Sequence, residues 1–187
     1  MNYLTIISLP IIVGVFILAD KVVLLFKDDY SLAVWPLRIS ILSLIFIFLN
    51  FPIGSLLNAC DAQKKNTKNM IIVALVSVAL NLILIPRFQA IGASWVVLTT
   101  NFLMFILGMI EARKIVGNFR KNIFSTFFKA FFASILMGLI VYLGAIYFNI
   151  FLLTIISAIF YFIFLFLVGG FSRADILSIK KSFVKKI

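Results

Sequence analysis

Residues 69–112 read NMIIVALVSVALNLILIP-RFQA-IGASWVVLTTNFLMFILGMIEA, two apolar runs (69–86 and 91–112) separated by a short turn around Arg87. Each run is about as long as a helix must be to cross a bilayer. Because a lipid interior offers backbone polar groups no water, such runs are helical. The sequence therefore predicts an all-α fold, a polytopic membrane helix bundle of about six transmembrane helices. The other four runs are residues 2–19, 34–59, 127–147 and 150–171.

Composition and charge support this class of protein. Hydrophobic residues make up 64% of the chain and charged residues 12%, whereas soluble domains are about a quarter charged. If the six runs alternate in direction, thirteen of the seventeen Lys and Arg residues fall on the side that holds both termini. The positive-inside rule places that side in the cytoplasm. The net charge of +11 then reflects membrane orientation, so we expect membrane lipids as partners and no nucleic acid.

Two domains are expected along the chain. Residues 1–171 form the transmembrane domain, and residues 172–187 form a basic cytoplasmic tail in which lysines alternate with apolar residues. Such a tail favours an amphipathic segment on the anionic inner leaflet. A disordered tail is the alternative.

Polar residues recur on one face of the run 34–59. At helical spacing a single strip collects Ser40, Ser43, Asn50, Gly54 and Asn58. A polar stripe on a membrane helix faces either a neighbouring helix or a wet cavity, and the sequence leaves both readings open. Asn101 lies on a similar small and polar face of the run 91–112. The candidate cavity-lining residues are Ser43, Asn50, Asn58 and Asn101.

Other features indicate packing and helix geometry. Ala130, Ser134 and Gly138 follow one another at four-residue steps, a ridge that lets two helix backbones approach closely. Pro52 is expected to kink the second half of its helix. Arg38, near the outer end of the same run, is expected to extend its charged group towards the interface.

The sequence offers no catalytic constellation. The chain has no histidine, and its six acidic residues lie in loops or near the ends of the apolar runs. Cys60 is the only cysteine. We therefore expect neither an enzyme nor a cofactor or metal site. Asp28 and Asp29 leave two readings open, a cation site and a solvated loop that caps the next helix.

A family resemblance rests on residues 55–114. Its motifs are Ser55-Leu56-Leu57-Asn58-Ala59, Gln63-Lys64-Lys65, Asn81-Leu82, Ile85-Pro86 and Ile91-Gly92-Ala93-Ser94. This pattern resembles the polysaccharide flippases of the multidrug/oligosaccharidyl-lipid/polysaccharide exporter superfamily, which includes O-antigen and lipid II flippases. Three places depart from the pattern. Gln89 stands where the family usually has a glycine, Ser94 replaces an alanine, and Asp61 or Ala62 occupies the region where an earlier glycine is common.

The resemblance implies a fold and a function. Family members have about twice as many spans, arranged as two lobes with a lipid-linked oligosaccharide between them. By resemblance, this chain corresponds to the C-terminal lobe portion of a MATE-like flippase in the bacterial inner membrane. The missing N-terminal lobe would come from another segment or another polypeptide. We therefore expect a C-terminal fragment, a split-gene product or the remnant of a disrupted gene.

Other functions stay open at this point. A cation-coupled drug exporter of the same superfamily fits the long basic inner loops less well. A membrane-embedded glycosyltransferase or acyltransferase would have only Asp28 and Asp29 in its support. An accessory membrane subunit without transport activity is a further alternative.

Overall fold

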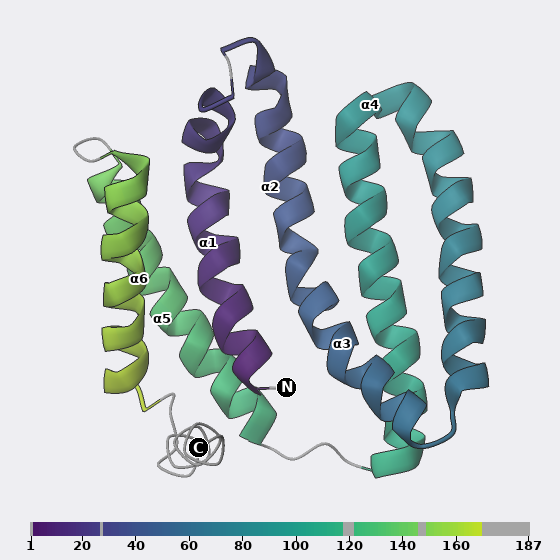
Figure 1. The fold of residues 1–187 in the computed structure, drawn as a ribbon. Coiled ribbons are helices and arrows are strands. Elements are labelled where there is room, and N and C mark those ends of the chain that lie inside the picture. Colours follow the sequence, from purple (N-terminus) through teal and green to yellow (C-terminus); the bar gives the residue numbers. More distant parts are fainter. Residues whose placement is uncertain (1, 27, 118–121, 146–148, 170–187) are drawn as a thin grey trace, which may run out of the picture.

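The structure, a computed structural model, describes residues 2–26, 28–117, 122–145 and 149–169 (Figure 1). Every regular element within these residues is helical, which confirms the predicted all-α fold. The predicted tail, residues 172–187, lies outside the described residues. In chain order the elements are α1 Asn2–Leu24, the 3-10 helix η1 Asp28–Ala33, α2 Val34–Leu42, α3 Leu44–Ala59, α4 Gln63–Val116, α5 Asn122–Gly144 and α6 Ile150–Leu167.

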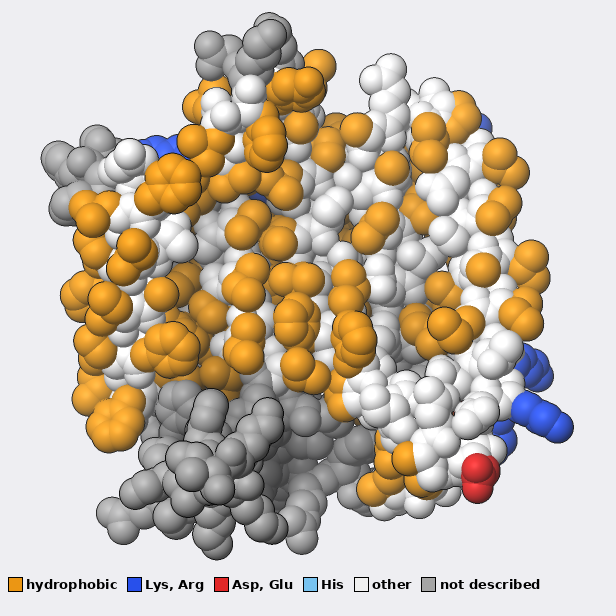
Figure 2. All heavy atoms as spheres, in the orientation of Figure 1, with side chains coloured by type: hydrophobic (Ala, Val, Ile, Leu, Met, Phe, Trp, Pro, Cys, Tyr) orange, Lys and Arg blue, Asp and Glu red, His pale blue; other side chains and the backbone are white. Residues whose placement is uncertain are grey.

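Five helical segments of the described chain are long and apolar enough to cross a membrane. These are Leu4–Leu24, Tyr30–Ala59, Gln63–Val116, Phe127–Gly144 and Ile150–Leu167. Hydrophobic side chains cover much of the face shown in Figure 2. The prediction of six spans differs in α4, which runs for 54 residues and includes both predicted runs, 69–86 and 91–112.

Helix α4 folds back on itself at Gln89, so its two legs lie side by side (Figure 1). Gln89 has φ 49° and ψ −127°, a conformation that favours glycine. Three residues beyond Gln89, the second leg packs closely against the first at Gly92. A Cβ added to Gly92 would collide with the carbonyl oxygen of Leu84. At the far end of the legs, Lys65 Nζ lies 3.4 Å from Glu111 Oε2. The two predicted runs are thus the two legs of one hairpin.

The predicted helix 34–59 is interrupted at Ser43, a position that the sequence did not indicate. The Ser43 N–H donates to the Ser40 carbonyl at 3.0 Å, a bond to the residue three positions back. The Ser43 hydroxyl donates to the same carbonyl at 2.7 Å. The chain then continues as α3, which passes through Pro52. Figure 1 shows α3 tilted relative to α2.

Helix α1 packs closely against α5 through the predicted ridge of small residues. Ala130 and Ser134 are both fully buried. A Cβ added to Gly138 would lie 2.8 Å from Val13 Cγ1 and 3.0 Å from Ile17 Cδ1. The absence of a side chain at Gly138 therefore allows the close approach of the two helices, and the predicted packing role of the ridge is confirmed.

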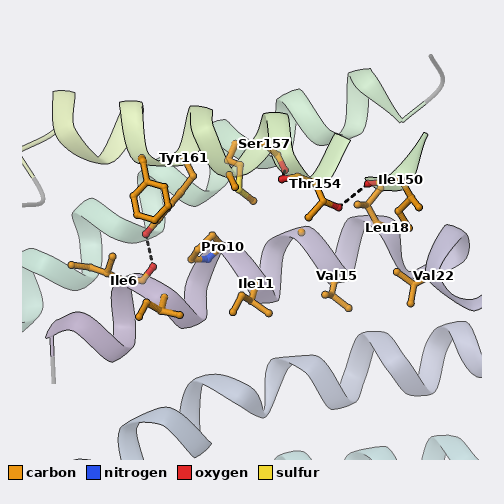
Figure 3. Close-up of a pocket in the computed structure, with 15 residues that line it drawn as sticks. Ile6, Pro10, Ile11, Val15, Leu18, Val22, Ile150, Thr154, Ser157 and Tyr161 are labelled. Atoms are coloured by element: carbon orange, nitrogen blue, oxygen red, sulfur yellow. Dashed lines mark hydrogen bonds between the residues drawn. The ribbon is translucent and has the colours of Figure 1, made fainter. Parts of the chain in front are cut away.

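A hydrogen bond links α6 to α1 at a point where α1 lacks one of its own. Pro10 has no N–H, so the carbonyl of Ile6, four residues earlier, loses its helical donor. The Tyr161 hydroxyl donates to this Ile6 oxygen at 2.6 Å (Figure 3). Tyr161 is only 2% exposed, so the bond lies inside the protein. The tyrosine supplies the donor that proline removed.

An ion pair joins α1 to α2 at the other end of the bundle. The Arg38 guanidinium donates to Asp20 Oδ2 at 2.6 Å and, through Nε, to the Phe16 carbonyl at 3.3 Å. It also lies 5.4 Å from the centre of the Trp35 ring, within the range of a cation–π contact. Arg38 was expected to extend towards the interface, and the structure gives it partners on α1.

Candidate functional site

An open groove of about 400 Å³ lies between α3 and the two legs of α4. Its polar lining comes from three helical segments: α3 and each leg of α4. Ile47, Phe51, Met70 and Met104 complete the walls. The polar lining residues are Asn50, Ser55, Asn58, Asn66 and Asn101, and Gly54 lies among them.

The groove contains three of the four candidate residues from the sequence. Asn50 and Asn58 reach it from α3, because they are spaced eight residues apart on one helical face. Asn101 reaches it from the second leg of α4. Ser43 does not line the groove. It is 2% exposed, and its hydroxyl is bonded to the Ser40 carbonyl within its own helix.

Asparagine side chains cross the groove between helices. Asn50 Nδ2 donates to the Asn101 carbonyl at 3.3 Å, which joins α3 to the second leg of α4. Asn66 Nδ2 lies 3.5 Å from Asn58 Oδ1, which joins α3 to the first leg. Asn101 Nδ2 donates to the Val97 carbonyl at 2.8 Å. These bonds hold the amide groups on the walls of the groove.

Two buried amide atoms at this end of α4 have no hydrogen-bond partner among the described residues: Asn66 Oδ1, an acceptor, and Asn69 Nδ2, a donor. A buried polar group without a partner costs about 1–3 kcal/mol. Asn66 lines the groove, and Asn69 lies one turn further along the same leg and is 7% exposed.

Sequence reasoning missed Asn66 and Asn69. Both occur in the segment KKNTKN, residues 64–69, which looks like a solvated loop because three lysines dominate it. The structure shows that this segment is already helical and belongs to α4. The spacing of three residues between the two asparagines, which places them near each other on a helix, was the available signal.

Within the described chain, no charged residue lines the groove. Glu111, an acidic residue near the end of α4, is paired with two lysines. Its Oε1 lies 2.7 Å from Lys114 Nζ, and its Oε2 lies 3.4 Å from Lys65 Nζ. The Lys65 pair joins the two legs of α4 at their basic end, whereas the Lys114 pair lies within the second leg. The carboxylate is therefore held by lysines rather than directed at a ligand.

Within the described residues, no group of three or more His, Cys, Asp or Glu side chains comes together that could hold a metal ion. Asp20 pairs with Arg38, and Cys60 is exposed. The side chains of Asp28 and Asp29, the pair for which a cation site stayed open, lie outside the described part of the chain. The polar groups of the groove are side-chain amides and the Ser55 hydroxyl, which donates to the Phe51 carbonyl at 3.0 Å.

A second cavity, of about 360 Å³, lies between α1, α5 and α6 (Figure 3). Its lining is mostly aliphatic, and each of its three hydroxyl groups donates to a backbone carbonyl. Tyr161 donates to Ile6, Thr154 to Ile150 at 2.7 Å, and Ser157 to the Thr154 carbonyl at 3.0 Å. This cavity suits hydrocarbon, whereas the groove at α3 and α4 suits a polar ligand.

Comparison of the chain with protein-family models, with curated proteins and with solved structures finds no match. The resemblance of residues 55–114 to the polysaccharide flippases therefore remains an expectation from the sequence.

Proposed function

We propose that this chain is the C-terminal portion of a membrane flippase that moves a polyprenyl-diphosphate-linked oligosaccharide across the bacterial inner membrane for polysaccharide biosynthesis. The convergence of Asn50, Asn58, Asn66 and Asn101 in one uncharged groove carries the proposal. The apolar helices and the resemblance of residues 55–114 to the flippase family support it as well.

The chemistry of the groove suits the sugar part of such a substrate. Each asparagine side chain provides two N–H donors and a carbonyl acceptor. Sugar hydroxyls both donate and accept, so they match amides better than they match a surface of one charge. A groove without charged residues also binds and releases a neutral sugar without the cost of desolvating an ion.

A complete transport path needs a second lobe in this proposal. Transporters built from repeats place the substrate at the interface between the repeats and expose it to each side in turn. The groove is open, and in this proposal its open side faces that second lobe. Another segment of a longer product or a separate polypeptide would supply it.

Cysteine labelling tests the role of the groove. In a Cys60→Ser background, which removes the exposed native thiol, single cysteines replace Asn50, Asn58 and Asn101 in the native product in its own membranes. A small charged thiol reagent should modify all three. The lipid-linked oligosaccharide should slow that modification.

Two control positions set the scale. Ser43→Cys is buried, and Val78→Cys is 60% exposed on the apolar surface that would face lipid, so both should stay unmodified with and without substrate. The proposal fails if the three groove positions are sealed, or if they react at the same rate with and without substrate, in variants that still support polysaccharide export.

A further inference from the structure

A second polar feature lies on the outer side of α4, at the start of its first leg. Here an open depression of about 560 Å³ has a lining of six residues from successive turns: Gln63, Lys64, Thr67, Lys68, Ile71 and Ile72. None of them lines the asparagine groove. The depression is therefore a separate surface, and its reading does not depend on the substrate of the groove.

The lining changes character along the helix axis. Lys64, Thr67 and Lys68 occupy the first turns of α4, and Ile71 and Ile72 follow in the next turn, where they are 56% and 37% exposed. In Figure 2, Lys and Arg side chains lie at the lower end of this leg, below hydrophobic side chains. Cationic groups directly beside lipid-facing aliphatic ones mark the boundary between headgroups and hydrocarbon.

Lys64 and Lys68 in the depression differ from the adjacent Lys65 in their ion pairing. Lys65 lies 3.4 Å from Glu111 Oε2. Among the described residues, Lys64 and Lys68 form no ion pair. Their spacing of four residues places both on one face of the helix. Two unpaired positive charges thus flank one hydroxyl, that of Thr67, over an aliphatic surface.

We propose that this depression binds an anionic phospholipid of the adjacent leaflet. Lys64 and Lys68 contact the phosphate, the Thr67 hydroxyl donates to it, and an acyl chain lies along Ile71 and Ile72. Charge complementarity selects this occupant, because a zwitterionic lipid brings its own cation to the same lysines. Each lysine near an anionic surface raises affinity about fivefold.

Tryptophan quenching by brominated lipid measures this selectivity. The reporter is Leu75→Trp, because Leu75 is 67% exposed and lies seven residues beyond Lys68 on the same face. The native Trp35 and Trp95 become Phe. The full native product is reconstituted in mixtures of phosphatidylcholine and brominated phosphatidylglycerol at fixed ionic strength. Brominated phosphatidylglycerol should bind at the reporter several-fold more strongly than brominated phosphatidylcholine.

Three variants locate the effect. Lys64→Gln and Lys68→Gln should each lower the preference about fivefold, and Lys64→Arg should retain it. The matched control Lys65→Gln removes the same charge from a lysine that is paired with Glu111, and should leave the preference unchanged. A reporter at Ile155 on α6, which is 61% exposed, should show no preference.

Three results would overturn the proposal. Equal quenching by both lipids at residue 75 would show that no selective site exists. An equal loss in Lys65→Gln would indicate a diffuse surface potential instead of a site. Competition by inorganic phosphate at millimolar concentration would show that the lysines bind free phosphate and that the acyl chain contributes nothing.

Discussion

The bond from Tyr161 to Ile6 predicts a specific energetic coupling to Pro10. Replacement of Tyr161 by Phe removes one hydroxyl and leaves the Ile6 carbonyl without a donor in a site where Ile6 is 5% exposed. A buried acceptor without a partner costs about 1–3 kcal/mol. The measured contributions of hydrogen bonds between membrane helices lie near the lower end of this range, at about 0.6–1.7 kcal/mol. We expect Tyr161→Phe to destabilise the fold by about 1–2 kcal/mol.

The same substitution should cost much less in a Pro10→Ala background. Alanine at this position restores an N–H, which can donate to the Ile6 carbonyl four residues earlier. The tyrosine is then no longer the only donor available to that oxygen. The double-mutant cycle should therefore give a coupling of about 1 kcal/mol between positions 10 and 161.

Reversible unfolding in mixed micelles, followed by far-ultraviolet circular dichroism, measures all four free energies. Tyr142→Phe is the matched control, because Tyr142 is 68% exposed on α5 and should give a change near zero. If Tyr161→Phe costs the same with proline and with alanine at position 10, the hydroxyl does not compensate for the proline and the reasoning is refuted.

Two further predictions concern the α4 turn. Gln89→Gly should stabilise the protein by about 1 kcal/mol, because it relieves a backbone strain of about 1–3 kcal/mol at φ 49°. Part of that gain is lost because glycine gives the unfolded chain more conformational entropy. Gln89→Ala should give no such gain in the same unfolding assay. Gly92→Ala should destabilise the fold by at least about 1 kcal/mol, because the new Cβ meets the Leu84 carbonyl, which is backbone and cannot rotate away. Gly14→Ala is its control, because the nearest atom to a Cβ there is 3.8 Å away, and a stable Gly92→Ala protein would show that the turn is looser than described.

The helices could be predicted from the sequence because their signal is local. A run of about twenty apolar residues has one stable solution in lipid, so α1, α5 and α6 follow from composition alone. The ends of the helices were harder to predict from the sequence. The interruption at Ser43 depends on a bond to the residue three positions back, which neither proline nor glycine announces. Helix α4 already begins at Gln63, although the lysines that follow make this segment look like a loop in the sequence.

The groove could be predicted only in part. Helical phase correctly placed Asn50 and Asn58 on one face of α3, but phase cannot show which face a neighbouring helix covers. Ser43 lies on the same strip, and the structure buries it outside the groove. Asn66 entered the groove because α4 folds back beside α3, a tertiary event with no local signal in the lysine-rich segment.

The hairpin of α4 has a consequence for how the chain enters the bilayer during synthesis. Between Lys68 and Glu111 the sequence contains a single charged residue, Arg87, next to the turn. Insertion of the two legs together therefore carries a single charge, that of Arg87, across the hydrocarbon. By the positive-inside rule, we expect the lysines and arginines before and after the hairpin to stay on the side of synthesis. One cooperative insertion event would then replace two, with the basic flanks setting its direction.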